Sequence, residues 1–280
     1  MVIFNTIAEI QLKLHEHAAN GHVVGFVPTM GALHKGHLSL IQECRINSDI
    51  TVCSIFVNPK QFNNSNDLQK YPRTLEKDIL LLENAGCDIL FCPTSEEMYP
   101  FKTQLEIQIG PLDKILEGKF RPGHLKGVAL VVLKLFNIIQ PNKVFFGQKD
   151  LQQCFLIQQL IKELSYNIDF YMIETLRESD GLAMSSRNVR LSESERKKAP
   201  ILYETMLMAK ALVLLRKIDE VKNVVIKKLE HEKFKLEYFE FVDLSTFKIS
   251  KKIKKKSSYA ICVAGYFDEV RLIDNIIFNT

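Results

Sequence analysis

Short apolar runs alternate with amphipathic stretches along roughly the first 175 residues of the chain. The apolar runs are rich in β-branched and aromatic residues, which is typical of buried strands. We expect strands at residues 22–27, 49–57, 87–92, 104–109, 143–147 and 168–174. Apolar positions three and four residues apart predict helices at 36–47, 71–86, 124–139 and from Asp150 onward. This alternation predicts βαβ units around a parallel sheet, an α/β fold.

The pattern changes after about residue 190. Residues 192–217 predict one helix, with Ser192 as its N-cap and Glu195 at the capping-box position. A second helix is expected near 217–231, followed by three strands with short connections, at 235–244, 258–265 and 270–278. The chain is therefore expected to end in a smaller α+β domain, with a boundary between about 175 and 190.

Composition and charge indicate an ordinary globular protein, with 46% hydrophobic and 25% charged residues. The net charge of +4 is too small to argue for nucleic-acid binding. The lysine run from Ser250 to Lys256 favours a solvated face, and the alternative of a nucleic-acid patch lacks interleaved aromatic residues. The longest apolar stretch is interrupted by Lys134 and is too short to span a bilayer.

The cysteines indicate a reducing compartment. None of the six forms a Cys-x-x-Cys pair, and most lie inside apolar runs, so neither a zinc site nor a disulfide framework is expected. The N-terminus lacks the basic segment and the cleavage site of a signal peptide. We therefore expect a cytoplasmic protein.

The chemically unusual residues all follow predicted strand ends. They lie in Pro28–His37, Asn58–Phe62, Gly147–Asp150 and Thr175–Asn188. Ligands of parallel α/β sheets bind outside the carboxyl ends of the strands. These four segments are therefore the candidate site.

The segment "PTMGALHKGHLSL" has two histidines, His34 and His37, on one face of a predicted first helical turn. With only Gly36 at the expected N-cap, free N–H groups and the helix dipole would favour an anion such as phosphate. A metal site is a weaker alternative because no carboxylate lies nearby, and two structural histidines are another. The chain has no Walker A and no Gly-x-Gly-x-x-Gly motif.

Two further segments suit a nucleotide. "DGLAMSSRN" offers two hydroxyls and the guanidinium of Arg187, although a helix-capping loop has the same composition. In "FFGQKD", Lys149 can meet phosphate and Asp150 can accept from ribose hydroxyls. Asp150 and Gln153 are also spaced like an N-cap and its N3 partner, and this structural alternative stays open.

Neutral amides and a basic segment complete the candidates. Gln61 and Gln153 can recognise hydroxyls and carboxylates without adding charge. Residues 118–127 collect Lys119, Arg121, His124 and Lys126 in a stretch with glycine and proline. That stretch predicts either a basic lid over an anion or an exposed loop.

Seven motifs together resemble the pantoate–β-alanine ligases across most of the chain: "PTMGALHKGHLSL", "FVNPKQF", "YPRTLEKD", "EGKFRPGHLKGV", "KLFNIIQPNKVFFGQKDLQQ", "DGLAMSSRN" and "RLIDN". That family belongs to the nucleotidyltransferases with a His-x-Gly-His signature, like class I aminoacyl-tRNA synthetases. The resemblance implies a Rossmann-like domain over residues 1–178 and a smaller α+β domain over 179–280 that closes over the site. It also implies a homodimer.

The resemblance implies ATP-dependent condensation of pantoate with β-alanine to pantothenate, within coenzyme A biosynthesis. ATP with Mg²⁺ activates pantoate as pantoyl-adenylate, releasing pyrophosphate, and β-alanine then displaces AMP. The catalytic residues it implies are His34, His37, Lys149 and Arg187, with His37 usually assigned as proton donor. The ATP-binding residues it implies are Met30, Gly31, Ala32, Leu33, His34, Lys35, Gly36, His37, Gly147, Gln148, Lys149, Asp150, Leu176, Met184, Ser185, Ser186 and Arg187.

The same resemblance assigns pantoate to Gln61 and Gln153, and β-alanine to Gln61. The chain departs from the family at Glu174, where proline is common, and at Leu130, where threonine is usual.

One alternative function is that of another small nucleotidyltransferase, which leaves a stable nucleotidyl product. A second rival is a non-catalytic nucleotide- or RNA-binding protein that uses the lysine run. No membrane or nucleic-acid partner is expected.

Overall fold

The computed structural model describes residues 1–280, with every side chain except that of Ser65. The chain divides into two compact units. Unit 1 comprises Met1–Gln148 and Gln152–Glu174, and unit 2 comprises Lys149–Leu151 and Thr175–Thr280. The expected boundary after residue 178 therefore lies inside unit 2, and three residues of the Gly147–Leu151 region group with unit 2 as well.

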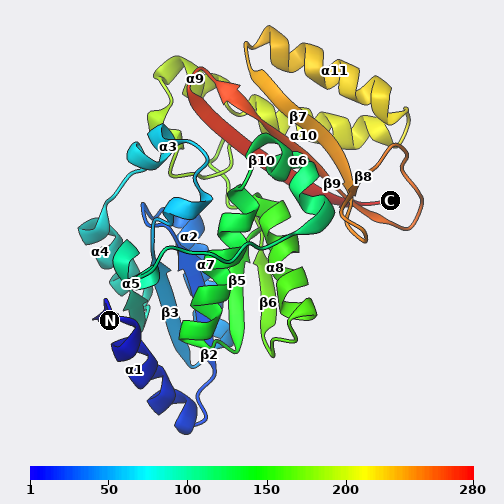
Figure 1. The fold of residues 1–280 in the computed structure, drawn as a ribbon. Coiled ribbons are helices and arrows are strands. Elements are labelled where there is room, and N and C mark those ends of the chain that lie inside the picture. The colour runs from blue at the N-terminus through cyan, green and yellow to red at the C-terminus, as the bar shows by residue number, and fades with distance from the viewer. The chain divides into compact units, whose positions relative to one another are not determined.

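Unit 1 is built on a six-stranded sheet whose strand pairs are all parallel, in the order β1-β4-β3-β2-β5-β6 (Figure 1). Its strands are β1 (Val2–Phe4), β2 (Val24–Thr29), β3 (Ile50–Ile55), β4 (Ile89–Phe91), β5 (Lys143–Gly147) and β6 (Asp169–Ile173). The chain leaves β2 toward β3 and β4, and later adds β5 on the other side of β2. This reversal between β2 and β5 is the topological switch point, where ligands of such sheets bind.

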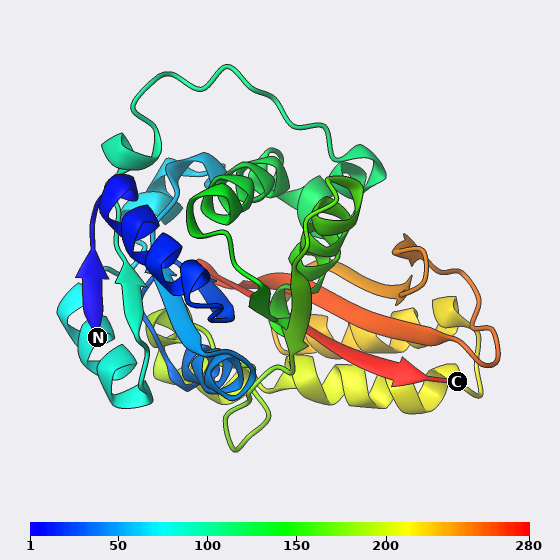
Figure 2. The same ribbon diagram turned by 90° about the horizontal axis from the view of Figure 1, so that it is seen from below.

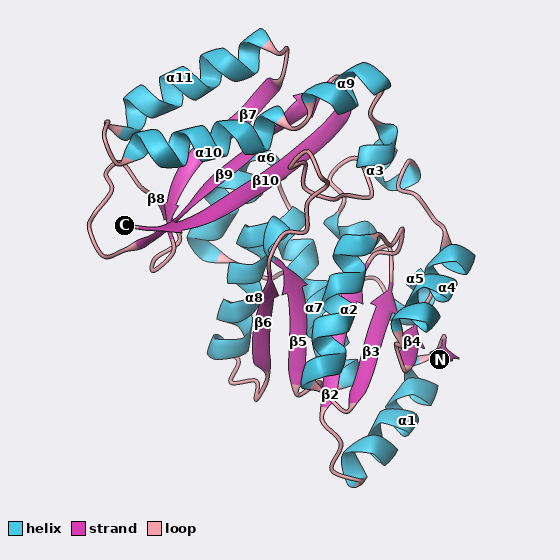
Figure 3. Ribbon diagram, turned by 180° about the vertical axis from the view of Figure 1, so that it is seen from behind, coloured by secondary structure: helices cyan, strands magenta, loops and turns pink.

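Helices cover both faces of this sheet. The longer ones are α1 (Ile7–Ala19), α2 (Lys35–Asn47), α4 (Leu75–Ala85), α7 (His124–Ile139) and α8 (Leu151–Glu163). Shorter ones are α3 (Ser65–Gln69), α5 (Ser95–Met98) and α6 (Leu116–Phe120), with 3-10 turns η1 (Pro59–Gln61), η2 (Gly110–Lys114) and η3 (Gln148–Asp150). Figure 1 shows α7 in front of the sheet, and Figure 3, from behind, shows α2 over the opposite face.

Alternating strand residues build the two cores of unit 1. Phe26 packs with α1 and α7 on one face, whereas Val27 packs with α2 and α4 on the other. Val52 and Cys53 of β3 divide in the same way. Because successive strand side chains point to opposite faces, a strand covered on both sides reads as a continuous apolar run. This explains why these strands could be predicted from short apolar stretches.

Several element predictions for unit 1 are wrong in detail. Helix α4 begins at Leu75 rather than residue 71, so Pro72 precedes the helix, while Gly86 ends it with φ of 75° as predicted. No strand forms at 104–109; Figure 2 shows an extended loop between α5 and α6, and Leu105 is 78% exposed. Without a neighbouring strand, such a segment gains no ladder hydrogen bonds. The prediction also missed β1 and α1 at the N-terminus.

Unit 2 contains an antiparallel sheet in the order β10-β9-β7-β8. Its strands are β7 (Lys235–Asp243), β8 (Lys248–Ile249), β9 (Ser258–Phe267) and β10 (Val270–Asn279). Its helical elements are η4 (Asn188–Arg190), α9 (Glu193–Lys198), α10 (Ile201–Val213) and α11 (Ile218–His231). Figure 3 shows α10 and α11 along one face of the sheet, where they enclose one apolar core. Among the 280 described residues, no helix has the length and apolarity needed to cross a membrane.

The helix predicted at 192–217 is two helices in the structure, α9 and α10. Pro200 separates them, because proline has no backbone N–H to continue the helical hydrogen bonds. The predicted capping box is confirmed: Ser192 accepts from the N–H of Glu195, and the Glu195 carboxylate accepts from the N–H of Ser192.

Candidate active site

The turn between β2 and α2 lies at the switch point of the sheet and is held by one buried carboxylate. Gly31 and Ala32 both have positive φ, 78° and 50°, so the chain reverses sharply there. The two oxygens of Asp78, a residue only 1% exposed, accept from the backbone N–H groups of Ala32 and Leu33 at 2.8 Å each. The Thr74 hydroxyl donates to the same carboxylate. Asp78 thus fixes the conformation that presents the following histidines.

Helix α2 starts one residue earlier than expected and has a histidine N-cap. Nδ1 of His34 accepts from the N–H of Gly36 at 3.1 Å, and Nδ1 of His37 accepts from the N–H of His34 at 3.3 Å. The two imidazoles therefore form a capping box, with ring centroids 4.1 Å apart. The expectation that only Gly36 stands at the N-cap is wrong, because the histidine rings supply the capping acceptors.

These bonds fix which ring nitrogen carries the proton. A backbone N–H can only donate, so each Nδ1 is an unprotonated acceptor and each neutral ring of His34 and His37 carries its hydrogen on Nε2. Adding a proton to Nδ1 would break the capping bond. The pair is therefore organised as two neutral donors through Nε2–H.

The sequence suggested free backbone N–H groups at this helix start, but five N–H groups of the turn already have side-chain acceptors. The N–H groups of Gly31, Ala32, Leu33, His34 and Gly36 each donate to a protein side chain. The imidazole Nε2–H groups are further donors at this helix start, where the helix dipole also favours an anion. The side chains that cap the helix are thus the ones that can meet a phosphate.

Gln61 lies at the end of η1, just after β3, and its side chain is nearly buried. Its Nε2 lies 2.9 Å from Sδ of Met30, and its Oε1 accepts from Nδ2 of Asn58 at 3.1 Å. Asn58 also donates to the carbonyl of Gly127 and accepts from the Tyr99 hydroxyl. A thioether is a weak acceptor, so the Gln61 amide can exchange this contact for a stronger acceptor on a ligand.

Helix α7 fixes the backbone of Gln61. The carbonyl of Gln61 lies 2.8 Å from Nδ1 of the buried His124, and Nε2 of His124 lies 2.9 Å from the Arg121 guanidinium. Because guanidinium can only donate, Nε2 accepts and Nδ1–H donates to Gln61. Gly127 allows the close approach, since a Cβ there would lie 2.2 Å from the carbonyl oxygen of Lys60.

Residues 118–127 are not an exposed loop. They form the end of α6 and the start of α7, with the helix α7 starting at His124. Arg121 is engaged with His124 and with Glu117, at 3.3 Å, and Lys126 pairs with Asp113 at 3.0 Å. Of these basic side chains, Arg121 and His124 support the Gln61 turn, and the interpretation of the whole segment as an exposed loop is wrong.

A mainly apolar cavity of about 260 Å³ adjoins the β2–α2 turn within unit 1. Met30 and Ala32 line it on the turn, and Phe56 and Cys92 line it after β3 and β4. It does not include the histidines or Gln61. The cavity lies beside the turn that the histidine pair follows, at the carboxyl ends of the strands.

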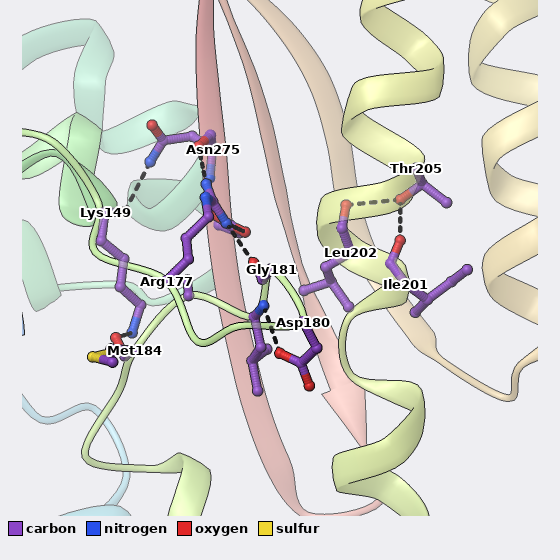
Figure 4. A network of polar contacts seen from close by, with 12 residues as sticks. Lys149, Arg177, Asp180, Gly181, Met184, Ile201, Leu202, Thr205 and Asn275 are labelled. Carbon is purple, nitrogen blue, oxygen red and sulfur yellow. Dashed lines mark hydrogen bonds and ion pairs between the residues drawn. The ribbon is translucent and has the colours of Figure 1, made fainter.

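In unit 2, Lys149 and the 184–187 loop are brought together. Nζ of the half-buried Lys149 donates to the carbonyl of Met184 at 3.0 Å, as Figure 4 shows. Burial lowers the pKa of Lys149 to about 8, partly opposed by Asp150 and Asp274. Such a perturbed amine beside a loop with hydroxyls and a guanidinium is typical of a functional site.

The loop is shaped by short local bonds. The N–H of Met184 donates to the carbonyl of Leu176 at 3.0 Å, and the N–H of Arg187 donates to Oγ of Ser185 at 3.3 Å. The Asn188 amide donates to the carbonyl of Ala183. The side chains of Met184, Ser185, Ser186 and Arg187 are all half-buried, and Leu176 is 40% exposed.

The structure thus brings the predicted residues together in two groups. Unit 1 joins the histidine turn with Gln61 through Met30, and it also holds Gly147, Gln148 and the half-buried Gln153. Unit 2 joins Lys149 with the 184–187 loop and holds the exposed Asp150. Among the side chains that the structure describes, no cluster of three or more His, Cys, Asp or Glu residues could hold a metal ion.

Sequence reasoning missed the supporting residues. Asp78 is an acid on the same helical face as Leu82, and this polar residue at a core position was the available signal. Asn58 lies in the predicted segment Asn58–Phe62, but its supporting role was not predicted, because asparagine is common in turns. Its bonds to Gly127 and Tyr99 depend on segments distant in the sequence.

Comparison with known proteins gives a consistent result. The family model described as pantoate-beta-alanine ligase matches residues 2–277. The pantothenate synthetase of Cytophaga hutchinsonii is 44% identical over 286 residues, covering 99% of each chain. That of Bacteroides thetaiotaomicron is 43% identical over 282 residues, covering 100% of this chain and 99% of the relative.

Solved structures agree. The pantothenate synthetase of Thermus thermophilus superposes with a TM-score of 0.91 at 40% identity, covering 99% of each chain. The pantoate-beta-alanine ligase of Francisella tularensis, described as complexed with beta-gamma ATP and beta-alanine, has a TM-score of 0.82 at 36% identity. It covers 99% of this chain and 97% of that one.

Proposed function

The chain belongs to the pantoate–β-alanine ligase family, and from that premise we propose how its residues carry out the ligation. The enzyme forms pantothenate from pantoate and β-alanine in an ATP-dependent reaction.

We propose two steps. A pantoate carboxylate oxygen attacks the α-phosphorus of ATP, the bond to the bridging oxygen breaks, and pyrophosphate leaves with its charge. The neutral amine of β-alanine then attacks the carbonyl carbon of pantoyl-adenylate, loses a proton, and expels AMP. The protein contributes positioning and charge stabilisation rather than a covalent intermediate.

His34 and His37 donate through Nε2–H to ATP phosphate oxygens in this proposal. Both Nδ1 atoms accept backbone N–H groups, which supports hydrogen-bond donation by neutral rings. A proton-donor role for His37 needs an imidazolium, and an imidazolium would lose its capping bond. Donors aimed at oxygens that gain charge contribute on the order of 10²–10³-fold each in rate.

Lys149 and Arg187 are the cations of the proposal. Lys149 binds phosphate oxygens after leaving the Met184 carbonyl, and the loop of Ser185, Ser186 and Arg187 closes on the polyphosphate. Asp150 accepts from the ribose hydroxyls, and the backbone at Leu176 contacts adenine. Met30–His37 and Gly147–Asp150 are likewise assigned to ATP in this proposal.

Pantoate is assigned to the amides of Gln61 and Gln153, and β-alanine to Gln61. Two contacts of Gln61 support this assignment. Its side-chain amide donates to the weak acceptor Sδ of Met30, and its backbone carbonyl is fixed by the hydrogen bond from His124. A neutral amide orients a carboxylate while leaving it nucleophilic. The adenylate must be kept from water between the steps, and we propose the 58–70 and 184–187 segments as covers.

Mg²⁺ enters this proposal with the nucleotide. No group of three or more His, Cys, Asp or Glu side chains among those described could hold a resident metal ion. When bound with ATP, Mg²⁺ would neutralise phosphate charge.

We further propose that the protein is a homodimer, which the native mass in solution would test. We also propose a cytoplasmic location, which the six free thiols favour.

The observation that carries the proposal is the histidine capping box at the switch point, with both Nε2–H groups set as donors. A coupled assay with ATP, pantoate and β-alanine tests it. Equal amounts of pantothenate, AMP and pyrophosphate support the two steps. A stable nucleotidyl product, unaffected by β-alanine, would support another nucleotidyltransferase activity instead.

A further inference from the structure

The segment "RLIDN" near the C-terminus has no role in the function described so far. It lies in β10 and ends in two adjacent polar residues that are almost fully buried, Asp274 (4% exposed) and Asn275 (2% exposed). Burying a carboxylate and an amide is costly unless both are hydrogen-bonded. Their partners therefore show what this part of the strand supports.

Asn275 binds the main chain of a proposed ATP ligand. Its Nδ2 donates to the backbone carbonyl of Lys149 at 3.0 Å, as drawn in Figure 4. Residues 149–151 group with unit 2, although residues of unit 1 flank them on both sides in the sequence. The Asn275 bond is one of the contacts that attach this three-residue segment to unit 2.

Asn275 is itself braced by an ion pair. Arg177 donates to both oxygens of Asp274, at 2.6 and 3.0 Å, and to the carbonyl of Asn275 at 3.2 Å. The Arg177 guanidinium also stacks 3.9 Å from the ring centroid of Tyr203. This bidentate, stacked arrangement has little freedom to move.

The other end of Lys149 is held in the same unit, where Nζ donates to the carbonyl of Met184. A lysine side chain has four rotatable bonds, so its ammonium is placed accurately only if its backbone is fixed. Asn275 supplies such a fixed point on the backbone. The low pKa of Lys149 shows that its ammonium is also sensitive to its surroundings.

We propose that Asn275, braced by Asp274 and Arg177, is a positioning residue that sets the Lys149 ammonium for binding ATP phosphates. The inference rests on the proposed role of Lys149. It assigns the last strand of unit 2 a part in the first step of the reaction and none in the attack by β-alanine.

The test compares Asn275→Ala with Asn279→Ala, an exposed asparagine on the same strand that bonds to Ser258. The rate of pyrophosphate release is measured at varied ATP concentration, and the KM for β-alanine is measured in a separate assay. Thermal denaturation shows whether each variant folds. We expect N275A to lower kcat/KM for ATP by about ten- to a hundredfold, with the KM for β-alanine unchanged. N279A should match the wild type. If N275A does not fold, Asn275→Ser, which is polar but too short to reach Lys149, replaces it.

A double-mutant cycle with Lys149→Ala separates positioning from general stability. We expect N275A to reduce the activity of K149A by less than about twofold, because its effect passes through the lysine. An equal loss in both backgrounds, or a lower melting temperature with unchanged kcat/KM for ATP, overturns the inference. Wild-type kinetics in K149A alone would instead overturn the role of Lys149 and the inference with it.

Discussion

Nδ1 of His37 accepts a hydrogen bond from the backbone N–H of His34, 3.3 Å away, at the first turn of α2. His37 thereby accepts an N–H group at the start of the helix that His34 caps. Because Nδ1 of each ring accepts a backbone N–H, each neutral ring carries its hydrogen on Nε2 and donates from there. The same side chains build the turn and offer donors to a phosphate. Local structure and proposed chemistry cannot be separated at this site.

The histidine pair predicts different outcomes for two substitutions of His37. His37→Gln retains a neutral N–H donor, whereas His37→Ala removes it. We expect H37A to slow pantoate-dependent pyrophosphate release by about 10²–10³-fold, and H37Q to keep at least about ten times more activity than H37A. His15→Ala, on an exposed position of α1, is the control. Equal loss in H37Q and H37A would favour proton transfer by His37.

Asp78 predicts a stability effect that reaches the site. Asp78→Ala leaves the buried N–H of Leu33 and the neighbouring N–H of Ala32 without their acceptor, so we expect a loss of about 2–4 kcal/mol in unfolding free energy. Urea denaturation measures it, and pyrophosphate release should fall as well. Glu76→Ala, exposed in the same helix, should change neither. A D78A protein as stable as the wild type would contradict the account of the turn.

Gly127 predicts a specific effect on pantoate. In Gly127→Ala the new Cβ would lie 2.2 Å from the Lys60 carbonyl oxygen and 2.7 Å from Cα of Gln61, so η1 must shift. We expect the KM for pantoate to rise about tenfold, with about 1–3 kcal/mol lost from stability. Steady-state kinetics with varied pantoate is the measurement. Asn137→Ala, exposed on the same helix, should leave the KM unchanged, and an unaltered KM in G127A would refute a role for this contact.

The lowered pKa of Lys149 leads us to expect that activity falls at alkaline pH. Burial lowers its pKa to about 8, so the free enzyme loses this positive charge as the pH rises through that value. We expect kcat/KM for ATP to fall above about pH 8. Lys149→Arg stays charged, and its profile should be flat there at a lower plateau. Lys162→Arg, on an exposed position of α8, should keep the wild-type profile. If kcat/KM for ATP still falls above pH 8 in K149R, a group other than Lys149 causes the loss of activity.

The sequence predicted well what local patterns determine. Helix α7 matches its expected bounds, because apolar positions three and four residues apart run along it. The strand at 143–147 is also correct, because a short apolar run is typical of a strand covered on both faces. The capping box of Ser192 and Glu195 followed from residue spacing alone. The break at Pro200 was missed because apolar spacing continues on both sides of it.

The site was predicted as a set of motifs but not as a set of bonds. Spacing placed His34 and His37 on one turn, yet histidine is not among the usual N-cap residues, so the capping box was not foreseen. The hydrogen bond between His124 and Gln61 joins residues 63 positions apart in the sequence. The bond between Asn275 and Lys149 joins residues 126 positions apart. Such contacts depend on the tertiary fold, which residue spacing along the chain does not encode.

Pyrophosphate release in the absence of β-alanine tests the central claim most directly. The enzyme is mixed with ATP and pantoate, and pyrophosphate is counted in the first turnover, with a second sample lacking pantoate. The account predicts one pyrophosphate per active site with pantoate and none without it, because the adenylate forms and stays protected. Release that requires β-alanine, or that proceeds equally without pantoate, would contradict activation of the carboxylate at the histidine turn.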